Sequence, residues 1–508
     1  MKSLIPVAMA AAALLPAAPA RGSVQISADP TNNMNCTAGV CTPTAKNADL
    51  NASDLANMLS AGDVKVQTAN GAVTITVTAP FSWTSTHRLT LDAQYNVSFK
   101  APVVVAGQGA VTIVTNDGGT GGDLIFYDGG KLDFWDTAAN FTFNGKSHIL
   151  VSDLASIAAA FIANRYAVLA LAKDYDAGQD GTYTDSLLPI PASMDGTFEG
   201  LGHTISNFSA AGNGRGIGLF GQSLYEGSIV RDLTLSKVNV RGSKDALAGA
   251  LGGGINATIT NVHASGVVSA TNNGTVGGLV GYGGRFFRSD SSVTVVCQKK
   301  CEAGGLVGFG GQFTLSHATG SVTVGGHSSA GGLIGVLGNS TISQSFATGD
   351  VATGKADKTA SLGGLAGLAI QHSRIDNSYA TGAVRNGGLS SLGGLLGAGQ
   401  ANIVSASYAT GAVGTVAAAP NRERNVGGFI GFVDYPDTYT DVYWDTDTSG
   451  VAVGCGASKP RNACPDIQGL GDAQLKSGLP AGFDPNLWAQ SPGINSGYPY
   501  LIANPPPQ

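Results

Sequence analysis

Three residues that can take part in acid–base or metal chemistry recur at one position of successive repeats. They are His263, Asp290 and His317, and the same position is held further along by Phe346, Tyr379, Tyr408 and Tyr443. If the repeats stack in register, these three residues lie on adjacent rungs, within reach of a shared metal ion or of proton transfer. The alternative, which we favour, is a packed ladder. Strand alternation places Tyr379 on the same side as Ile375 and Asn377, which favours packing over an exposed site.

Two acidic stretches resemble parts of calcium loops. Asp445, Asp447, Ser449 and Gly450 match the start of such a loop, D-x-D-x-S-G, but Cys455 and Gly456 stand where its bidentate Glu is needed. A weaker candidate is formed by Asp174, Asp176, Asp180 and Gly181. We expect ordinary turns at both places, and hence no metal site and no cofactor.

Other catalytic signatures are missing from the sequence. Neither a G-x-S-x-G nucleophile elbow nor an H-E-x-x-H zinc motif is present. The Gly-Gly-Leu-Val-Gly phrases are not followed by Lys-Ser or Lys-Thr, so we interpret them as turn geometry and not as phosphate loops. We therefore expect no catalytic residues, and we predict that the protein is not an enzyme.

The composition excludes several classes of protein. Charged residues make up 12 % of the 508 residues, the net charge is −6 and no basic block occurs, so nucleic acid is not an expected partner. Glycine accounts for 74 residues, while hydrophobic residues still reach 43 %. This balance excludes collagen, argues against disorder and favours a β-rich architecture with many tight turns.

The six cysteines form three pairs that are close in sequence. These pairs are Cys36 with Cys41, Cys297 with Cys301, and Cys455 with Cys464. An even count in an exported chain favours disulfides over zinc ligation, and such short spacings predict that each disulfide staples one loop.

A repeat of about 30 residues fills the second half of the chain. Its glycine-rich phrase occurs at 217–221, 248–252, 277–281, 304–308, 331–335, 363–367, 393–397 and 427–431. One copy is too short to bury its own apolar residues, so we predict that the copies stack as coils of a parallel solenoid. The apolar residues of the phrase would then form one internal ladder. Its members are Leu279, Leu306, Leu333, Leu365, Leu395 and Phe429.

The chain divides into five expected parts. Residues 1–20 are predicted to be a signal peptide, with Lys2, an apolar run over 4–15 and a small-residue cleavage site over 18–20. The mature chain, which starts near Arg21, holds no second apolar run long enough to span a membrane. Residues 21–48 are expected to be an irregular lead-in, 49–200 a β-helical segment, 201–445 the repeats, and 446–508 a closing segment.

Short helices are predicted near 53–60 and 153–164, with Ser53 and Ser152 as their N-caps. A solenoid needs its open ends covered. We expect the helix near Ser53 and the Pro-rich C-terminus to be the caps.

The repeats resemble the GLUG repeat, which is found in large bacterial surface proteins. Residues 50–205 also look like the segment that precedes such repeats in filamentous-haemagglutinin-like proteins, and the ending from Val442 to Leu501 resembles the C-terminal closure of that family. The resemblance implies an all-β, right-handed parallel β-helix with short capping helices. It also implies a secreted or outer-membrane-associated protein at the cell surface.

The function that we expect is adhesion, in which a rigid rod contacts surface glycans, matrix proteins or other cells. One alternative is a purely structural component of the surface or matrix. A less favoured alternative is a polysaccharide lyase or hydrolase built on the same scaffold, for which the sparse charged residues assemble no convincing set.

Overall fold

The computed structural model describes residues 22–507 except 118, 120, 128, 186–187, 192, 215, 222–223, 355–358, 387–389, 416–424, 460–463 and 465–466. The predicted signal peptide, residues 1–20, lies outside the described residues. The chain forms a β-solenoid of about 14 turns with a few short helices, which confirms the predicted fold class.

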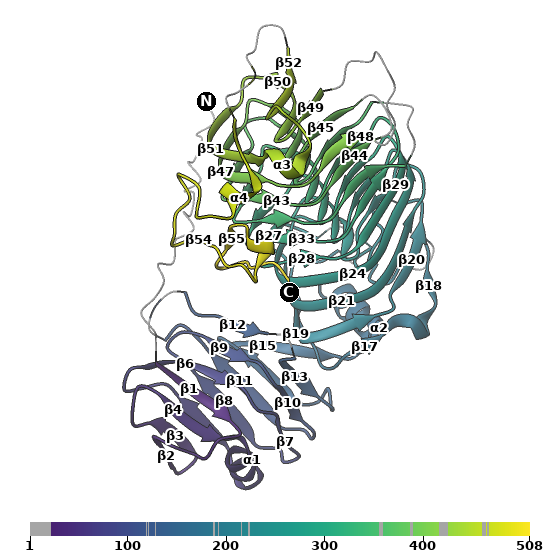
Figure 1. Cartoon of the computed structure of the whole chain (residues 1–508). Coiled ribbons are helices and arrows are strands. Elements are labelled where there is room, and N and C mark those ends of the chain that lie inside the picture. Colours follow the sequence, from purple (N-terminus) through teal and green to yellow (C-terminus); the bar gives the residue numbers. More distant parts are fainter. Residues whose placement is uncertain are drawn as a thin grey trace, which may run out of the picture.

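The coils form two stacks, each with its own hydrophobic core (Figure 1). The N-terminal stack runs from β1 (Gly22–Ser27) to β14 (Asn140–Phe143), and the C-terminal stack begins with β15 (Lys146–Val151) and α2 (Leu154–Ala163). The change of core therefore lies near residue 150. The boundary expected at residue 200 falls inside β19 (Thr197–Ser206).

The N-terminal stack contains three parallel sheets. The first sheet holds β4 (Ala48–Asn51), β1, β6 (Ala72–Val77), β9 (Val97–Phe99) and β12 (Leu124–Phe126). The second holds β7 (Phe81–Trp83), β10 (Pro102–Val105) and β13 (Lys131–Phe134). The third holds β3 (Val40–Pro43), β5 (Val64–Gln67), β8 (Arg88–Asp92), β11 (Ala110–Val114) and β14.

The prediction of an irregular lead-in over 21–48 is wrong. β1 pairs in parallel with both β4 and β6, and β2 (Met34–Thr37) forms an antiparallel hairpin with β3. These strands have four to six residues and bury only a few side chains each, such as Val24 and Ile26 of β1. The alternation is thus too brief to stand out in the sequence.

Three parallel sheets also form the C-terminal stack. One contains β22 (Leu247–Ala248), β25 (Thr275–Gly277), β30 (Glu302–Gly304), β35 (Ser329–Gly331), β40 (Ser361–Gly363), β45 (Ser391–Gly393) and β49 (Asn425–Gly427). The next contains β23 (Gly252–Gly254), β26 (Val280–Tyr282), β31 (Val307–Phe309), β36 (Ile334–Gly338), β41 (Ala366–Ile370), β46 (Leu396–Gln400), β50 (Ile430–Tyr435) and β52 (Cys455–Ser458).

The third sheet starts with long strands that divide into shorter ones in later coils. The long strands are β19, β21 (Ile229–Gly242) and β24 (Thr258–Asn272), and β24 pairs with β27 (Arg285–Phe287), β28 (Asp290–Ser291) and β29 (Thr294–Lys299) of the next coil. The following coil supplies β32 (Gln312–Thr314), β33 (His317–Ala318) and β34 (Val322–Val324). Later members include β38 (Phe346–Ala347), β43 (Tyr379–Ala380), β47 (Ile403–Ala409), β51 (Thr438–Asp445) and β53 (Gln468–Leu470).

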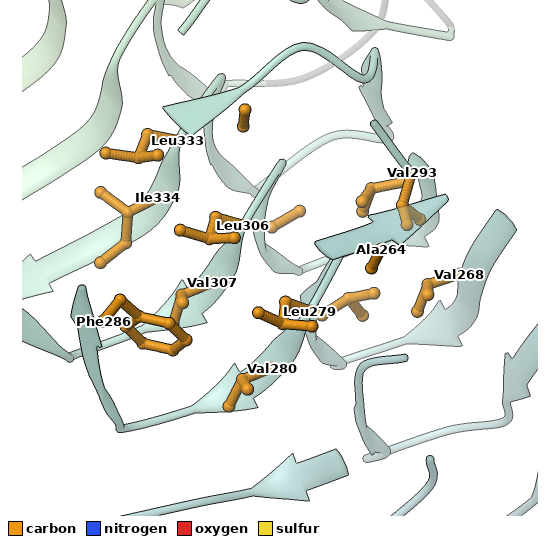
Figure 2. Packing of buried hydrophobic residues seen from close by; sticks show 14 of the residues in the cluster. Ala264, Val268, Leu279, Val280, Phe286, Val293, Leu306, Val307, Leu333 and Ile334 are labelled. Atoms are coloured by element: carbon orange, nitrogen blue, oxygen red, sulfur yellow. The ribbon is translucent and has the colours of Figure 1, made fainter. Parts of the chain in front are cut away.

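The glycine-rich phrases place their large apolar residues one above another inside the coil (Figure 2). The amide of Leu279 donates to the carbonyl of Leu306, and that of Leu306 to Leu333, both at 2.9 Å. The same bonding continues through Leu365 and Leu395 to Phe429, and the six side chains are fully buried. A second column of Val280, Val307 and Ile334 rises beside the first one (Figure 2).

A left-handed residue recurs at one position of the third sheet in successive coils. These residues are Leu201, Asp232, Asn261, Arg288, Leu315, Gln344, Asn377, Ala406 and Asp441, with φ between 45° and 54°. A buried serine follows most of them, and its backbone N–H donates to the serine hydroxyl of the next coil. The serines are Ser289, Ser316, Ser345, Ser378 and Ser407, linked at 3.1–3.3 Å. The hydroxyls thus satisfy buried N–H groups that the turn takes out of the sheet ladder.

Two helices of ten residues cover apolar residues of the first coils. α1 (Ala52–Ala61) buries Leu55 and Leu59 at the free end of the N-terminal stack (Figure 1). α2 buries Leu154, Ile157 and Phe161 in the core of the C-terminal stack. Their N-caps are Asn51 and Asp153, and not Ser53 and Ser152 as expected.

The Pro-rich C-terminus does not close the end of the solenoid, contrary to the prediction. Residues 475–504, the C-terminal segment, run back along the outside of the coils, and the chain ends beside the middle of the C-terminal stack (Figure 1). The three predicted disulfides are confirmed, and the described residues contain no free cysteine.

We predict that Leu306→Ala lowers the free energy of unfolding by about 2–5 kcal/mol, because the residue is fully buried and a cavity would remain. Val267→Ala is the matched control, since Val267 is 42 % exposed and its loss should change stability by only about 0.5 kcal/mol. Urea denaturation followed by circular dichroism measures both variants. Equal losses would contradict the position of Leu306 in the internal ladder.

Candidate functional site

The three residues singled out by the repeats lie on adjacent rungs of the third sheet. His263 of β24 is in register with Asp290 of β28, which is in register with His317 of β33. Aromatic rings continue the column from there. His317 stacks on Phe346 with ring centroids 4.6 Å apart, and Phe346 stacks on Tyr379 at 4.8 Å. Tyr379 stacks on Tyr408 at 5.1 Å, and Tyr443 follows in register.

The column lies outside the coil, so the expectation that Tyr379 shares a side with Ile375 is wrong. Ile375 and Ala380 belong to the internal core, whereas Tyr379 packs in a separate cluster. The reason is the left-handed Asn377 between them, which has a φ of 47° and interrupts the alternation of the strand.

The C-terminal segment covers the aromatic part of the column. Trp488, Phe483 and Tyr498 pack against these rings, and the indole of Trp488 donates to Asn377 Oδ1 at 3.1 Å. The covering ends at Asn504, whose Oδ1 lies 3.2 Å from His317 Nδ1. His263 and Asp290 lie beyond that point, and their side chains are 39 % and 25 % exposed.

Both ring nitrogens of His263 face oxygen atoms. Nδ1 bonds to Asp290 Oδ2, and Nε2 lies 3.1 Å from Asn261 Oδ1. The side-chain amide of Asn261 is fixed in this orientation because its Nδ2 donates to Asp232 Oδ1 at 2.6 Å. Both ring nitrogens of His263 are thus already engaged by side chains of this protein. This geometry fits a structural link better than a general base.

The remaining members of the column differ in charge. Burial would raise the pKa of Asp290, but its hydrogen bond with His263 and the charges of His263 and His317 lower it below its ordinary value. Burial lowers the pKa of His317, which outweighs the opposite effects of Asp290 and of the hydrogen bond with Asn504. Burial thus favours the neutral form of His317, while the hydrogen bond with His263 favours the ionised form of Asp290.

Hydrogen bonds continue from His263 across the junction of the two stacks. Asp232, which accepts the hydrogen bond from Asn261 Nδ2, also accepts one from Arg231 Nε at 2.7 Å. Arg231 then reaches the N-terminal stack, where it donates to Asp123 Oδ1 at 2.9 Å and to the carbonyl of Leu124 at 2.6 Å. One network of side chains thus runs from Asp290 of the C-terminal stack to β12 of the N-terminal stack.

Arg231 also contacts two buried carboxyl groups. Its Nε lies 3.1 Å from Glu199 Oε2, and the side chains of Glu199 and Asp232 are each 1 % exposed. Burial and the neighbouring Asp232 raise the pKa of Glu199 well above its ordinary value. Burial alone would lower the pKa of Arg231, but the carboxylates of Asp232, Glu199 and Asp123 raise it. We conclude that Arg231 is charged and holds this part of the junction together.

A second histidine supports the same junction. His203 is fully buried, with Nδ1 3.1 Å from Asp174 Oδ1 and Nε2 3.0 Å from the carbonyl of Leu132 in the N-terminal stack. Asp174 also binds Lys131 Nζ at 2.8 Å. The hydrogen bond from His203 and that from Lys131 outweigh burial and lower the pKa of Asp174.

These residues surround a polar cleft of about 260 Å³ between the two stacks. Its walls are formed by Phe126, Tyr127, Gly129, Gly130, Lys131, Asp174, Gly202, Thr204, Asp232, Thr234, Asn261 and His263. Because Asp174, Asp232 and His263 are already bound to other side chains, the cleft offers fixed polar groups to a ligand and not a mobile acid or base.

The two stretches that resemble calcium loops form short helices, α3 (Thr446–Ser449) and the 3-10 helix Ala177–Asp180, and not the ordinary turns that were expected. Asp445 caps α3 by accepting the N–H groups of Asp447 and Thr448, and its other oxygen accepts the hydroxyl of Tyr498. Asp176 accepts the N–H of Gly178, while Asp180 accepts two tyrosine hydroxyls. Among the described residues, no three His, Cys, Asp or Glu side chains are placed to hold one metal ion.

Sequence reasoning identified the column but missed the junction. Arg231 and Asp123 are 108 residues apart, and no repeat connects them. The only local signal was an Arg next to an Asp in a chain with few charges. The covering of the column was also missed, although the C-terminal segment contains the aromatic residues Phe483, Trp488 and Tyr498.

Over the part of the chain that the structure describes, no helix has the length and apolar character needed to cross a lipid bilayer.

Comparisons with known proteins find three similarities. Residues 359–385 match the GLUG motif. A stretch of 238 residues is 31 % identical to halomucin from Haloquadratum walsbyi; it covers 44 % of this chain and 2 % of halomucin, so the chain spans only a small fraction of that protein. Among solved structures, a "putative immunoglobulin A1 protease" from Bacteroides ovatus is similar at 15 % identity and a TM-score of 0.36, over 70 % of this chain and 93 % of that one.

Replacing Arg231 by Ala should lower the free energy of unfolding by about 3–5 kcal/mol, because the buried Asp232 would lose its cation. Arg241→Ala is the control, since Arg241 is exposed and bonds only to Asn239. Chemical denaturation of both variants measures the difference. Similar stabilities would show that Arg231 does not hold the junction.

The lowered pKa of His317 makes stability depend on pH. Below a pH of about 6.5 the unfolded chain binds a proton at this residue that the folded chain resists, so stability falls as the pH falls. His317→Phe, which copies Phe346 of the next coil, should remove this loss. Thermal melting from pH 8 to pH 5 tests it. Parallel pH profiles for the variant and the original chain would refute the assignment to His317.

Proposed function

We propose that this protein is a secreted or cell-surface β-solenoid that attaches to glycans, matrix proteins or cells without catalysing a reaction, in the manner of filamentous-haemagglutinin-type adhesins. The observation that carries the proposal is the register of the coils. Each coil presents the same positions at a spacing of ~4.8 Å, so the exposed faces carry rows of equivalent side chains. Such rows suit weak, repeated contacts with a ligand that itself repeats.

The state of His263 supports the non-catalytic part of the proposal. Its two ring nitrogens are bound to Asp290 and Asn261, and the carboxylates around the cleft are bound to Arg231, Lys131 and His203. An acid–base catalyst needs a group that gains or loses a proton against the substrate. We therefore assign these residues to holding the two stacks together.

The similarities in sequence support the proposed location of the protein at the cell surface or outside the cell. The match to the GLUG motif and the similarity to halomucin both favour a protein at the surface or outside the cell. The three disulfides agree with an oxidising compartment.

A second candidate function is cleavage of polysaccharides at the junction cleft, which holds Lys131, Asp174 and Asp232 around about 260 Å³. Incubation of the purified chain with a polysaccharide panel, followed by measurement of reducing ends and of unsaturated sugars, tests it. Release of either product, and its loss in His263→Ala, would replace the non-catalytic proposal.

For the leading proposal we would label the purified chain and measure its retention on arrays of polysaccharides, matrix proteins and whole cells. We expect saturable retention on a defined surface, with competition by the free ligand and no released product. Retention on none of these surfaces, together with self-association of the chain, would contradict attachment and point to a structural component.

A further inference from the structure

A groove crosses five successive coils of the C-terminal stack at the corner that follows β26 and β31. Its volume is about 380 Å³. It is lined by Glu226, Asn256, Tyr282, Gly283, Gly284, Arg285, Phe309, Gly310, Gly311, Gln312, Gly338 and Ser340. At the rise of ~4.8 Å per coil, the groove extends for about 19 Å along the axis of the stack.

The floor of the groove is backbone. Gly284 and Gly311 have φ values of 94° and 97°, which other residues rarely adopt. A Cβ at either position would also meet the buried ring beneath it, at 2.6 Å from Phe286 and 3.0 Å from Phe313. These two rings stack at 5.2 Å, and Phe286 is seen beside the internal columns in Figure 2. The floor is therefore flat and rigid.

One wall of the groove ends in an aromatic ring with a free face. Tyr282 stacks on Phe309 of the next coil with centroids 5.4 Å apart and planes at 11°, and Tyr282 is 45 % exposed. The residue in register with Tyr282 on the preceding coil is Gly254, which has no side chain to cover the other face. Among the described residues, which leave out 222 and 223 of the coil before, a Cβ built at Gly254 would meet only Leu247, at 3.9 Å.

The other lining groups are polar and carry little net charge. Arg285 is paired with Glu226 across the coils, so the single cation and the single anion of the groove offset each other. Asn256, Gln312 and Ser340 add side-chain donors and acceptors. A polyanion would need unpaired cations, and this groove does not supply them.

We infer that this groove binds a neutral glycan, with one sugar ring packed on the free face of Tyr282. This inference rests on the proposed function and names the ligand class and the surface. A pyranose ring presents C–H groups on its face and hydroxyl groups around its edge. The face matches an aromatic ring, and the hydroxyl groups match the amides of Asn256 and Gln312.

The test uses two variants that act on Tyr282 in opposite ways. Tyr282→Ala removes the ring, whereas Gly254→Phe adds a ring that stacks on the free face and blocks it. Tyr435→Ala is the matched control, because Tyr435 is 56 % exposed and lies outside the groove. Thermal melting first verifies that each variant remains folded.

Calorimetric titration with cellohexaose, chitohexaose and mannohexaose then measures the affinity, with hexagalacturonate as the acidic comparison. We expect one of the neutral hexasaccharides to bind, Tyr282→Ala and Gly254→Phe each to weaken it by about tenfold, and Tyr435→Ala to stay within about twofold. If a hexasaccharide binds and neither groove variant weakens it, the groove is not the binding site, although the proposed attachment to glycans would still hold. Tighter binding of hexagalacturonate would overturn the ligand class. If no glycan binds here or on the arrays, both the groove and glycan attachment fail.

Discussion

The structure depends on in-register stacking of successive coils. Strands such as β30, β35 and β40 obtain their backbone partners from the neighbouring coils, so a position that suits one coil must suit the next. The corner serines show how strict this is. A left-handed residue such as Asn377 takes the following N–H out of the ladder, and the hydroxyl of Ser407 on the next coil accepts it. The left-handed conformation is unfavourable for most residues, and the repeated hydrogen bond to a serine hydroxyl satisfies the N–H group that this conformation displaces.

Stacking also explains why one column of side chains changes character along its length. At the aromatic end, the rings of Phe346, Tyr379 and Tyr408 pack against each other and under the C-terminal segment. Beyond Asn504 that covering stops, and the same position carries His263 and Asp290, which join the network across the junction. The column therefore serves packing at one end and connects the two stacks at the other. Neither role requires a free acid or base.

The sequence was sufficient to predict the features that recur from one repeat to the next. The period placed Leu279 above Leu306 and His263 beside Asp290, because equal spacing and parallel pairing determine register. It could not predict the direction of Tyr379, since the left-handed Asn377 reverses it without a residue type that demands this. The contact of Arg231 with Asp123 was equally hidden, because no local pattern links residues 108 positions apart. The short strands before residue 48 bury too few side chains to be recognised.

The most direct test of this account is an electron cryo-microscopy or crystal structure of the full chain with a bound neutral hexasaccharide. The account predicts that the glycan lies in the groove of the C-terminal stack, packs a sugar ring on Tyr282, and remains uncleaved. A glycan that lies in the junction cleft against His263 and Asp232, or one that has been cut there, would contradict it.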